Sequence, residues 1–461
     1  MQNFDTIIKN GTIVTASDTY RGDIGIKDGR ITQIGLKLDS SCENIIDADG
    51  KYIFPGGIDP HTHMDMPFGG TFSSDDFLTG TKAAACGGTT TIVDFAVQPK
   101  GKTLKETTKI WREKADNKAC IDYGIHISIT DMNDEILEEM ESIIKEGYSS
   151  FKLFMTYEGM KVEDDTLMKA LIRARDKGGI ICVHAENHYV IDYLVKKLLS
   201  EGKIEPKYHA LSRPELCEGE AAGRAIKLAE ICGAPLYIVH NTCNASVSEI
   251  ERARNLGYPI MGETCPQYLL LSYENYEEED FNGAKYVMSP PLRDKSNWEH
   301  IWKALQKGTL QVVATDHCPF FMEQKRMGIN SFDKIPNGAP GVELRMALMY
   351  TYGVLQNKIS LQKFVEVTST NAAKIFGMYP QKGSIAVGSD ADLVIFDPEK
   401  EIEVKEENLN ENVDYTPYEG FKLKGYPVMT LLRGEIIAKD GKFVGKKGIG
   451  KFIKRGRGEI L

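Results

Sequence analysis

Two histidines stand one residue apart in the run His61-Thr62-His63, which follows an apolar stretch. Residues i and i+2 of a strand point to the same side, so the two imidazoles would face one point. Imidazole is the commonest protein ligand for zinc and related divalent ions. Two histidines without any metal role show this spacing about as often as a metal-binding pair does. The pair therefore predicts a metal site only if other donors join it.

Other groups that can bind a metal or move a proton stand on further apolar runs. His184, His240 and Asp316 each end a strand-like run, and Lys152 lies within a fourth one. If the runs are parallel strands of one barrel, their carboxyl ends meet at the face where such barrels place active sites. Buried polar groups there need partners, because an unpaired buried charge is costly. A metal centre would satisfy the whole set.

The number of donors indicates two metal ions. Four histidines and one carboxylate exceed what a four-coordinate catalytic zinc needs while keeping one position open. An ammonium has no lone pair for a metal, so Lys152 needs a separate explanation. Burial and nearby cations favour its neutral amine. That amine can take up carbon dioxide, and the resulting carbamate could bridge two metals about 3.5–4 Å apart. The alternative is a lysine held in a buried ion pair.

The middle of the chain alternates apolar runs with helix-like stretches such as 133–146, 166–177 and 219–231. Runs that are apolar throughout are typical of strands buried on both faces. Eight of them with helical connections favour a (β/α)8 TIM-like barrel, an α/β fold. The predicted strands are Tyr52–Ile58, Thr89–Ala96, Ile121–Ile129, Ser150–Met155, Gly179–His184, Ala234–His240, Tyr258–Glu263 and Leu310–Asp316.

Both ends of the chain have a different texture, with short alternating runs broken by turn signals. Asn10-Gly11, Asp28-Gly29, Arg433-Gly434 and Asp440-Gly441 stand between such runs and predict hairpins. We therefore expect a small β-sandwich domain formed by both termini. Residues 1–52 and 379–445 are its predicted parts, 53–378 the catalytic barrel, and 446–461 a basic C-terminal tail that is solvated or docks on a subunit.

Composition narrows the class of protein. The 461 residues are 42% hydrophobic and 26% charged, which is ordinary for a globular chain. A net charge of −10 argues against a nucleic-acid or anionic-membrane surface. No apolar run approaches the length of a membrane span, and the start lacks a signal-peptide pattern. Nine cysteines without CxxC spacing favour reduced, mostly buried thiols in a cytoplasmic protein.

Several stretches together resemble the D-hydantoinase and dihydropyrimidinase family of cyclic amidohydrolases, in the amidohydrolase superfamily. The resemblance covers essentially the whole chain. The matching stretches are Pro55-Gly56-Gly57-Ile58-Asp59-Pro60-His61-Thr62-His63, Phe151-Lys152-Leu153-Phe154-Met155-Thr156-Tyr157, Val183-His184-Ala185-Glu186-Asn187, Gly262-Glu263-Thr264-Cys265-Pro266, Tyr286-Val287-Met288-Ser289-Pro290-Pro291, Asp316-His317-Cys318-Pro319-Phe320 and Lys334-Ile335-Pro336-Asn337-Gly338.

The resemblance implies two Zn²⁺ ions, with Mn²⁺ or Co²⁺ as alternatives, bridged by carboxylated Lys152. It also implies that Tyr157 assists the substrate carbonyl oxygen, that Ser289 and Asn337 hold the cyclic ureide, and that the chain forms a homotetramer. The expected reaction is attack of a metal-bridging hydroxide on the ring carbonyl, with Asp316 as general base and then acid. The product would be an N-carbamoyl amino acid. The implied metal ligands are His61, His63, Lys152, His184, His240 and Asp316.

The substrate class is less constrained than the metal site. Dihydroorotase-like sequences carry an arginine shortly after the HxH pair, whereas this chain continues Met64-Asp65-Met66-Pro67-Phe68. Asp65 would repel a substrate carboxylate, while Met66 and Phe68, with Phe154 and Met160, predict an apolar wall for a 5-substituted hydantoin or dihydropyrimidine. Allantoinase and dihydroorotase remain alternatives. A non-catalytic dihydropyrimidinase-like scaffold is disfavoured because all six implied ligands are present.

Overall fold

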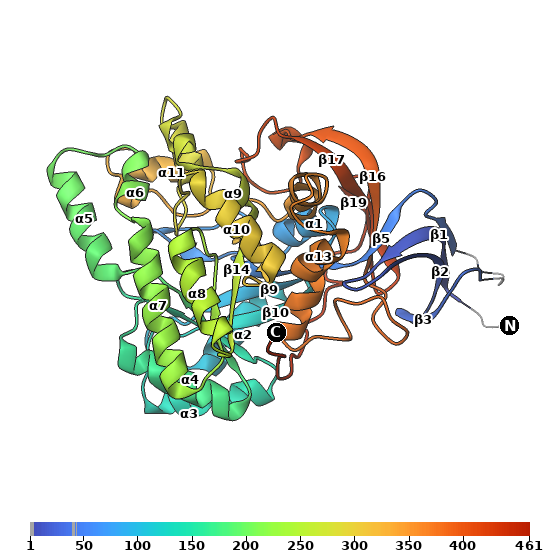
Figure 1. Cartoon of the computed structure of the whole chain (residues 1–461), viewed down its shortest axis with the longest axis horizontal. Coiled ribbons are helices and arrows are strands. Elements are labelled where there is room, and N and C mark those ends of the chain that lie inside the picture. Colours follow the sequence, from blue (N-terminus) through green and yellow to red (C-terminus); the bar gives the residue numbers. More distant parts are fainter. Residues whose placement is uncertain (1–3, 39–41, 43) are drawn as a thin grey trace.

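The computed structural model describes residues 4–38, 42 and 44–461. Two β units follow each other along the long axis, with a helix-wrapped barrel at one end and a sheet built from both chain ends at the other (Figure 1). This arrangement confirms the predicted (β/α)8 barrel with a terminal β domain.

Eight parallel strands make up the barrel sheet within the described part of the chain. They pair in chain order, each with the next, so the sheet curls round upon itself. The ring closes where Thr62 bridges His317 and the His63 amide donates to the His317 carbonyl at 2.9 Å. The strands are β6 (Gly57–Thr62), β9 (Thr89–Val97), β10 (Asp122–Ser128), β11 (Ser150–Phe154), β12 (Ile180–His184), β13 (Leu236–Ile238), β14 (Ile260–Thr264) and β15 (Val312–Val313).

Helices cover the outside of this barrel, and their apolar faces pack on the strands. Sequence signals fix several ends: the Asn133 side chain caps α3, and Gly178 and Gly233 end α4 and α7 in the left-handed region. The longer helices are α1 (Thr79–Cys86), α2 (Leu104–Ala115), α3 (Asp134–Lys145), α4 (Asp164–Lys177), α5 (His188–Ser200), α7 (Glu215–Cys232), α8 (Asn244–Asn255) and α10 (Ser296–Lys307).

Shorter helices complete the connections and the return to the terminal sheet. They are α6 (Lys207–Leu211), α9 (Pro266–Leu270), α11 (Met322–Lys325), α12 (Arg345–Met349), α13 (Leu361–Val365) and α14 (Asn371–Ile375). A two-stranded hairpin, β7 (Pro67–Phe68) with β8 (Thr71–Phe72), projects from the loop after β6. None of the helices in the described ranges is long and apolar enough to cross a lipid bilayer.

Strands from both chain ends form one sheet over the described residues, as predicted. Its order is β19-β18-β17-β16-β5-β1-β2-β3, with β4 also paired to β1. Its apolar core joins Ile8, Ile13 and Ile24 from one chain end to Ile395 and Leu431 from the other. The strands are β1 (Thr6–Val14), β2 (Thr19–Lys27), β3 (Arg30–Gly35), β4 (Asn44–Asp47), β5 (Tyr52–Pro55), β16 (Leu393–Glu403), β17 (Lys422–Leu432), β18 (Glu435–Lys439) and β19 (Lys442–Phe443).

One strand prediction and one hairpin prediction were wrong. The stretch Tyr52–Ile58 is not one barrel strand: β5 pairs with β1 and β16 in the terminal sheet, and β6 begins the barrel. Asn10-Gly11 is not a hairpin but a bulge inside β1, where Asn10 has a φ of 62°. A Cβ on Gly11 would lie 2.3 Å from Ile53, so packing rather than a turn requires that glycine. The other three predicted turns do connect antiparallel strands.

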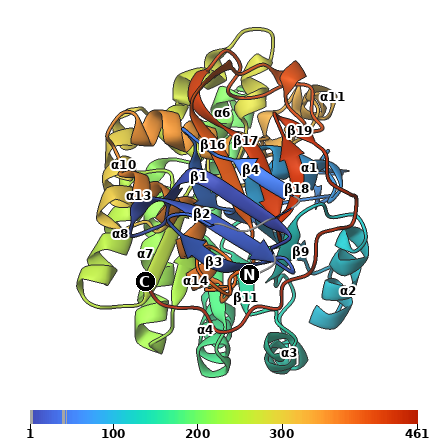
Figure 2. The same cartoon turned by 90° about the vertical axis from the view of Figure 1, so that its right-hand side faces the viewer.

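The prediction of a solvated basic tail is also wrong, because the tail packs on the barrel. Residues 446–461 run across the amino ends of the barrel strands, the dark red segment at the base of Figure 2. The Ile453 amide donates to the Tyr123 carbonyl at 2.8 Å, and the buried Arg455 guanidinium donates to Ser150 Oγ at 2.8 Å. The tail therefore covers the barrel end opposite the strand carboxyl ends.

A buried ion cluster fastens the terminal sheet to the same end of the barrel. The Lys382 ammonium lies 2.5 Å from Asp122 at the start of β10, 3.0 Å from Asp390 and 2.6 Å from Asp392. Arg433 from the turn between β17 and β18 also pairs with Asp122. Removing one member of such a set leaves uncompensated buried charge, which is strongly destabilising. These three carboxylates therefore have a structural explanation.

Candidate metal centre and substrate cavity

One cavity at the carboxyl ends of the barrel strands brings together all the predicted site residues. It holds about 540 Å³ of empty space, counting its open mouth. Predicted residues that line it are His61, His63, Met66, Phe68, Lys152, Phe154, Tyr157, Met160, His184, His240, Ser289, Asp316 and Asn337. Pro67, Val97, Cys318 and Gly338 also line it and were not predicted.

The polar side chains converge on Asp316. Its Oδ1 lies 3.1 Å from His61 Nε2 and 2.9 Å from His63 Nε2. The rings of His184 and His240 have centroids 4.5 Å apart, and those of His61 and His240 lie 5.4 Å apart. One donor atom from each of His61, His240 and Asp316 falls within 4.8 Å of the others. The strands that carry these residues are neighbours in the barrel or meet where it closes. Their carboxyl ends therefore place the side chains around a single point.

Carboxylates behind the histidines fix the ring orientations. His61 Nδ1 bonds Glu263, which also accepts from the Tyr237 hydroxyl at 2.9 Å, and His184 Nε2 lies 2.7 Å from Glu186. A carboxylate on one ring nitrogen sets the tautomer and leaves the other nitrogen for a metal. Neither Glu263 nor Glu186 was predicted as a site residue. Glu263 ends an apolar strand just as His184 does, so the same pattern could have found it.

Lys152 lies on β11 at the floor of the cavity and is 1% exposed. Among the residues that the structure describes, it has no hydrogen-bond or ion-pair partner, and its Nζ lies 4.9 Å from the Phe95 ring centroid. Burial lowers its pKa to about 8. The alternative of a buried ion-pair lysine is therefore not supported, and a neutral amine is accessible near neutral pH.

Burial also keeps most of the histidines neutral. It lowers the pKa of His63 to about 4 and those of His184 and His240 well below their usual value. Burial opposes charge on His61 too, but the Asp316 and Glu263 carboxylates outweigh it and raise the pKa of His61 to about 9. Neutral imidazole is the form that binds a metal.

Three of the converging residues have unusual backbone conformations. Tyr157, His240 and Asp316 have φ values of 75°, 37° and 55°, in the left-handed region that residues other than glycine rarely adopt. Such strain costs on the order of 1–3 kcal/mol per residue and concentrates at functional sites. Here it turns each side chain from the end of its strand or loop into the cavity.

The donor set fits a divalent metal centre. Nδ1 of His63 and Nδ1 of His240 are buried without a hydrogen-bond partner in the described ranges, and Lys152 is likewise unpaired. Imidazoles with carboxylates suit zinc, manganese and cobalt alike. The geometry thus supports metal binding here but does not select the metal.

Tyr157, Ser289 and Asn337 stand at the mouth of the cavity. The Tyr157 ring packs 5.1 Å from the His184 ring and edge-on to Phe68 at 5.6 Å. Burial raises the pKa of Tyr157, so its phenol remains a hydrogen-bond donor. Asn337 Nδ2 donates to Ser289 Oγ at 3.0 Å, which links the two loops that follow Val287 and Pro336.

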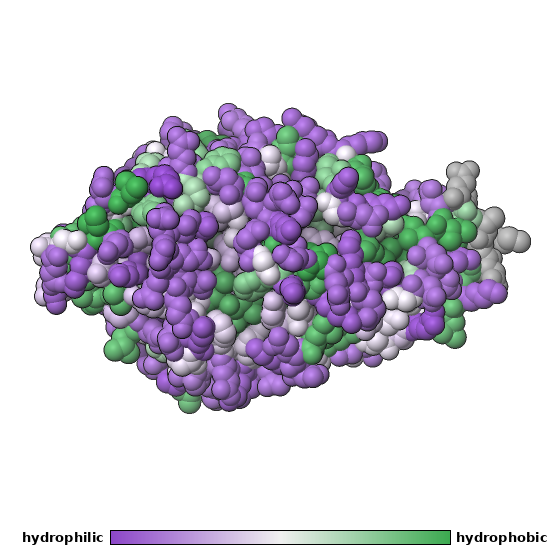
Figure 3. Space-filling model, turned by 90° about the horizontal axis from the view of Figure 1, so that it is seen from above, coloured by the Kyte–Doolittle hydropathy of each residue, from purple (hydrophilic) through white to green (hydrophobic). Residues whose placement is uncertain are grey.

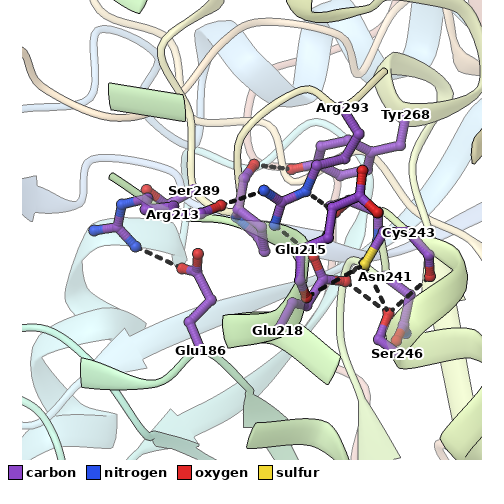
Figure 4. Close-up of polar contacts among 12 residues, drawn as sticks. Glu186, Arg213, Glu215, Glu218, Asn241, Cys243, Ser246, Tyr268, Ser289 and Arg293 are labelled. Carbon is purple, nitrogen blue, oxygen red and sulfur yellow. Dashed lines mark hydrogen bonds and ion pairs between the residues drawn. The ribbon is translucent and has the colours of Figure 1, made fainter. Parts of the chain in front are cut away.

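A network of buried charged side chains lies behind these cavity residues (Figure 4). Arg213 donates to Glu186 at 2.6 Å and stands 5.6 Å from the Tyr157 ring centroid. Arg293 donates to the Arg213 carbonyl and pairs with Glu218 at 2.9 Å, and Figure 4 shows it between those two partners. The network joins α7 to the loop before α10, and no local feature of the sequence predicts it.

The sequence and the fold of this chain are both similar to those of known proteins. Residues 52–437 match the amidohydrolase family. The chain belongs to the amidohydrolase family, and the predicted resemblance is confirmed.

Within that family the similar proteins are hydantoinases and dihydropyrimidinases. The chain is 51% identical to a D-hydantoinase of Geobacillus stearothermophilus, over 98% of this chain and 96% of that protein. It is also 51% identical to a D-hydantoinase of Ralstonia pickettii, over 98% and 99%. The crystal structure of dihydropyrimidinase from Brevibacillus agri NCHU1002 superimposes with a TM-score of 0.98 at 51% identity, covering 98% of this chain and 99% of that one.

Proposed function

We propose that the chain hydrolyses the cyclic amide bond of 5-substituted hydantoins and dihydropyrimidines, giving N-carbamoyl amino acids. The observation that carries the proposal is the single cavity in which metal donors, a tyrosine hydroxyl, two polar loops and an apolar wall face one another. The relatives named D-hydantoinase and dihydropyrimidinase support the same substrate class.

His61, His63, His184, His240 and Asp316 would hold two divalent ions, which we propose to be zinc, with carboxylated Lys152 between them. Two such ions lower the pKa of a bound water and make hydroxide available near neutral pH. The Lys152 amine has no partner in the part of the chain that the structure describes and is easily deprotonated, as carbamate formation requires.

The protein groups would divide the remaining work. The Tyr157 hydroxyl would donate to the ring carbonyl oxygen as negative charge develops there, which is the role of an oxyanion-hole donor. Asp316 would take the proton of the attacking water and deliver it to the leaving ring nitrogen. Ser289 and Asn337 would hold the ring through the polar groups of their two loops, so that the scissile carbonyl faces Asp316.

The rest of the lining bears on the substituent of the substrate. Met66, Phe68, Phe154 and Met160 form the predicted apolar wall. Asp65, however, does not line the cavity: it pairs with Lys114 at 3.3 Å. The expectation that Asp65 repels a substrate carboxylate is therefore wrong. Among the described residues no arginine lines the cavity to bind a carboxylate, so dihydroorotate remains disfavoured.

Steady-state hydrolysis of a substrate panel tests this function. Metal-replete protein should turn over 5-phenylhydantoin with a kcat/KM at least about tenfold above those for allantoin and dihydroorotate, because its buried apolar substituent contributes over about 1.4 kcal/mol. Dihydrouracil, which has no such substituent, should also be hydrolysed. Chelator-stripped protein is the control and should regain activity with zinc, manganese or cobalt. A preference for allantoin or dihydroorotate would contradict the proposal.

We also propose that the chain forms a homotetramer. Apolar patches interrupt the hydrophilic surface at the end of the molecule that carries α5 (Figure 3). There Val190, Leu211 and Leu216 are 41%, 49% and 78% exposed, beside the exposed rings of Tyr189 and Tyr193. Exposed apolar groups gathered this way mark protein interfaces. Sedimentation equilibrium should give a particle of four 51.4 kDa chains, and a monomer at micromolar concentration would contradict the proposal.

A further inference from the structure

A buried ammonium joins the two loops that carry Ser289 and Asn337. Lys325, at the end of α11, is 0% exposed. Its Nζ donates to three backbone carbonyls: Val287 at 2.9 Å, Pro336 at 2.7 Å and Gly338 at 2.6 Å. An ammonium has three donors, and all three are used on these loops.

No acidic side chain neutralises this cation. Lys325 has no ion-pair partner among the described residues, and the centroid of the Phe320 ring lies 5.6 Å from its Nζ. Burial lowers the pKa of Lys325 to about 7, so its ammonium form predominates only below neutral pH. Keeping a charged side chain inside a protein on neutral acceptors alone costs free energy. A neutral residue of similar shape would avoid that cost, so the charge itself needs an explanation.

The three carbonyls lie next to the groups proposed to hold the substrate ring. The Pro336 carbonyl shares its peptide unit with the Asn337 N–H, and no acceptor within the described residues takes up that N–H. A cation at the oxygen of a peptide polarises the whole unit and makes its N–H a stronger donor. Positive charge on Lys325 would thus strengthen the Asn337 N–H for a carbonyl oxygen of the ring.

The loop of Asn337 has few other constraints from side chains. Gly338 has a φ of 146°, and a Cβ there would lie 2.2 Å from the Cys318 carbonyl oxygen. Backbone contacts therefore place this segment: the Gly338 amide donates to the Val287 carbonyl at 2.9 Å, the same oxygen that Lys325 binds. Among the described residues, Lys325 is the one side chain that donates hydrogen bonds to the backbone on both sides of Asn337 and also to the loop of Ser289.

We propose that Lys325 is a positioning residue for substrate binding, which ties the two ring-binding loops together and strengthens the backbone N–H of Asn337. The inference rests on the proposed function of the cavity. Lys325 lines neither the cavity nor the metal centre, so it acts through its carbonyl partners. It should therefore affect how tightly the ring binds more than the chemistry that follows.

Two variants separate the effect of the Lys325 hydrogen bonds from the effect of its positive charge. Lys325→Gln keeps two N–H donors without the charge, and Lys325→Met removes both. Lys334→Met is the matched control, because Lys334 is 70% exposed on the neighbouring segment. The KM for hydantoin should rise about tenfold in Lys325→Gln and further in Lys325→Met, since the lost interaction is with a charged group. The kcat should stay within about threefold and bound metal at the wild-type level.

The outcomes distinguish the inference from the function on which it rests. If wild-type protein hydrolyses hydantoins while the KM of Lys325→Gln matches that of Lys334→Met, the inference is wrong. A parallel loss of metal in Lys325→Gln would also overturn it, because the residue would then support the whole site. If wild-type protein hydrolyses no member of the panel, the proposed function itself fails. Thermal unfolding of Lys325→Gln shows whether the fold is kept.

Discussion

Lys152→Ala should remove bound metal and activity together. The side chain is buried on β11 without a partner among the described residues, and it faces the histidines across the cavity. If its carbamate bridges the two ions, alanine leaves both of them short of a ligand. We expect kcat/KM to fall on the order of 10³-fold or more, because metal-ion stabilisation of developing charge contributes several kcal/mol and each 1.36 kcal/mol is tenfold in rate.

Chemical rescue makes this prediction specific to a carbamate. The truncated side chain leaves space in which a short carboxylic acid such as acetate or propionate could supply the two missing oxygens. Millimolar acid should restore part of both the metal content and the activity of Lys152→Ala. Lys177→Ala, which changes a lysine on the surface of α4 that pairs with Glu141, should keep wild-type metal and activity and gain nothing from acid. Full activity of Lys152→Ala without acid would refute the carbamate bridge.

The candidate metal donors could be placed together in one cavity from sequence because their signal is local. A parallel strand buried on both faces is apolar throughout, so a histidine or aspartate at its end is conspicuous. His184 does end β12, and His240 and Asp316 follow β13 and β15 by only a few residues. Barrel geometry then brings strand ends together whatever their separation in the chain. The fold and the strand-end residues of the cavity could therefore be predicted from the same pattern.

Apart from Glu263, the supporting groups had no comparable signal. Arg293 pairs with Glu218 across 75 positions of sequence, and Lys325 donates to backbone carbonyls, which any residue type would present. The tail was misjudged for the same reason: its lysines and glycines are typical of a solvated segment, but Arg455 fits between strands and donates to Ser150. Local composition does not show which partner a long cationic side chain will find.

Replacing the catalytic carboxylate tests the division between holding metal and moving protons. Asp316→Asn keeps the size of the side chain and one oxygen that can contact a cation, but an amide cannot carry the proton of the attacking water to the ring nitrogen. The kcat should therefore fall by about 10²–10⁴-fold, the usual contribution of general acid–base catalysis. The KM should change little, because in the proposed function Ser289 and Asn337 rather than Asp316 would hold the ring.

Metal content decides what a loss of activity in Asp316→Asn means. With most of the metal retained, the deficit in kcat belongs to proton transfer. With the metal lost, Asp316 is chiefly a ligand, as its contacts of 3.1 Å and 2.9 Å with His61 and His63 also permit. Asp23→Asn is the matched control: Asp23 is a buried aspartate too far from the cavity to act there, on β2 in the terminal sheet, where it accepts the Asn10 and Leu38 amides. A kcat for Asp316→Asn within threefold of that control would exclude Asp316 as the proton carrier and leave the leaving nitrogen to be protonated by another group.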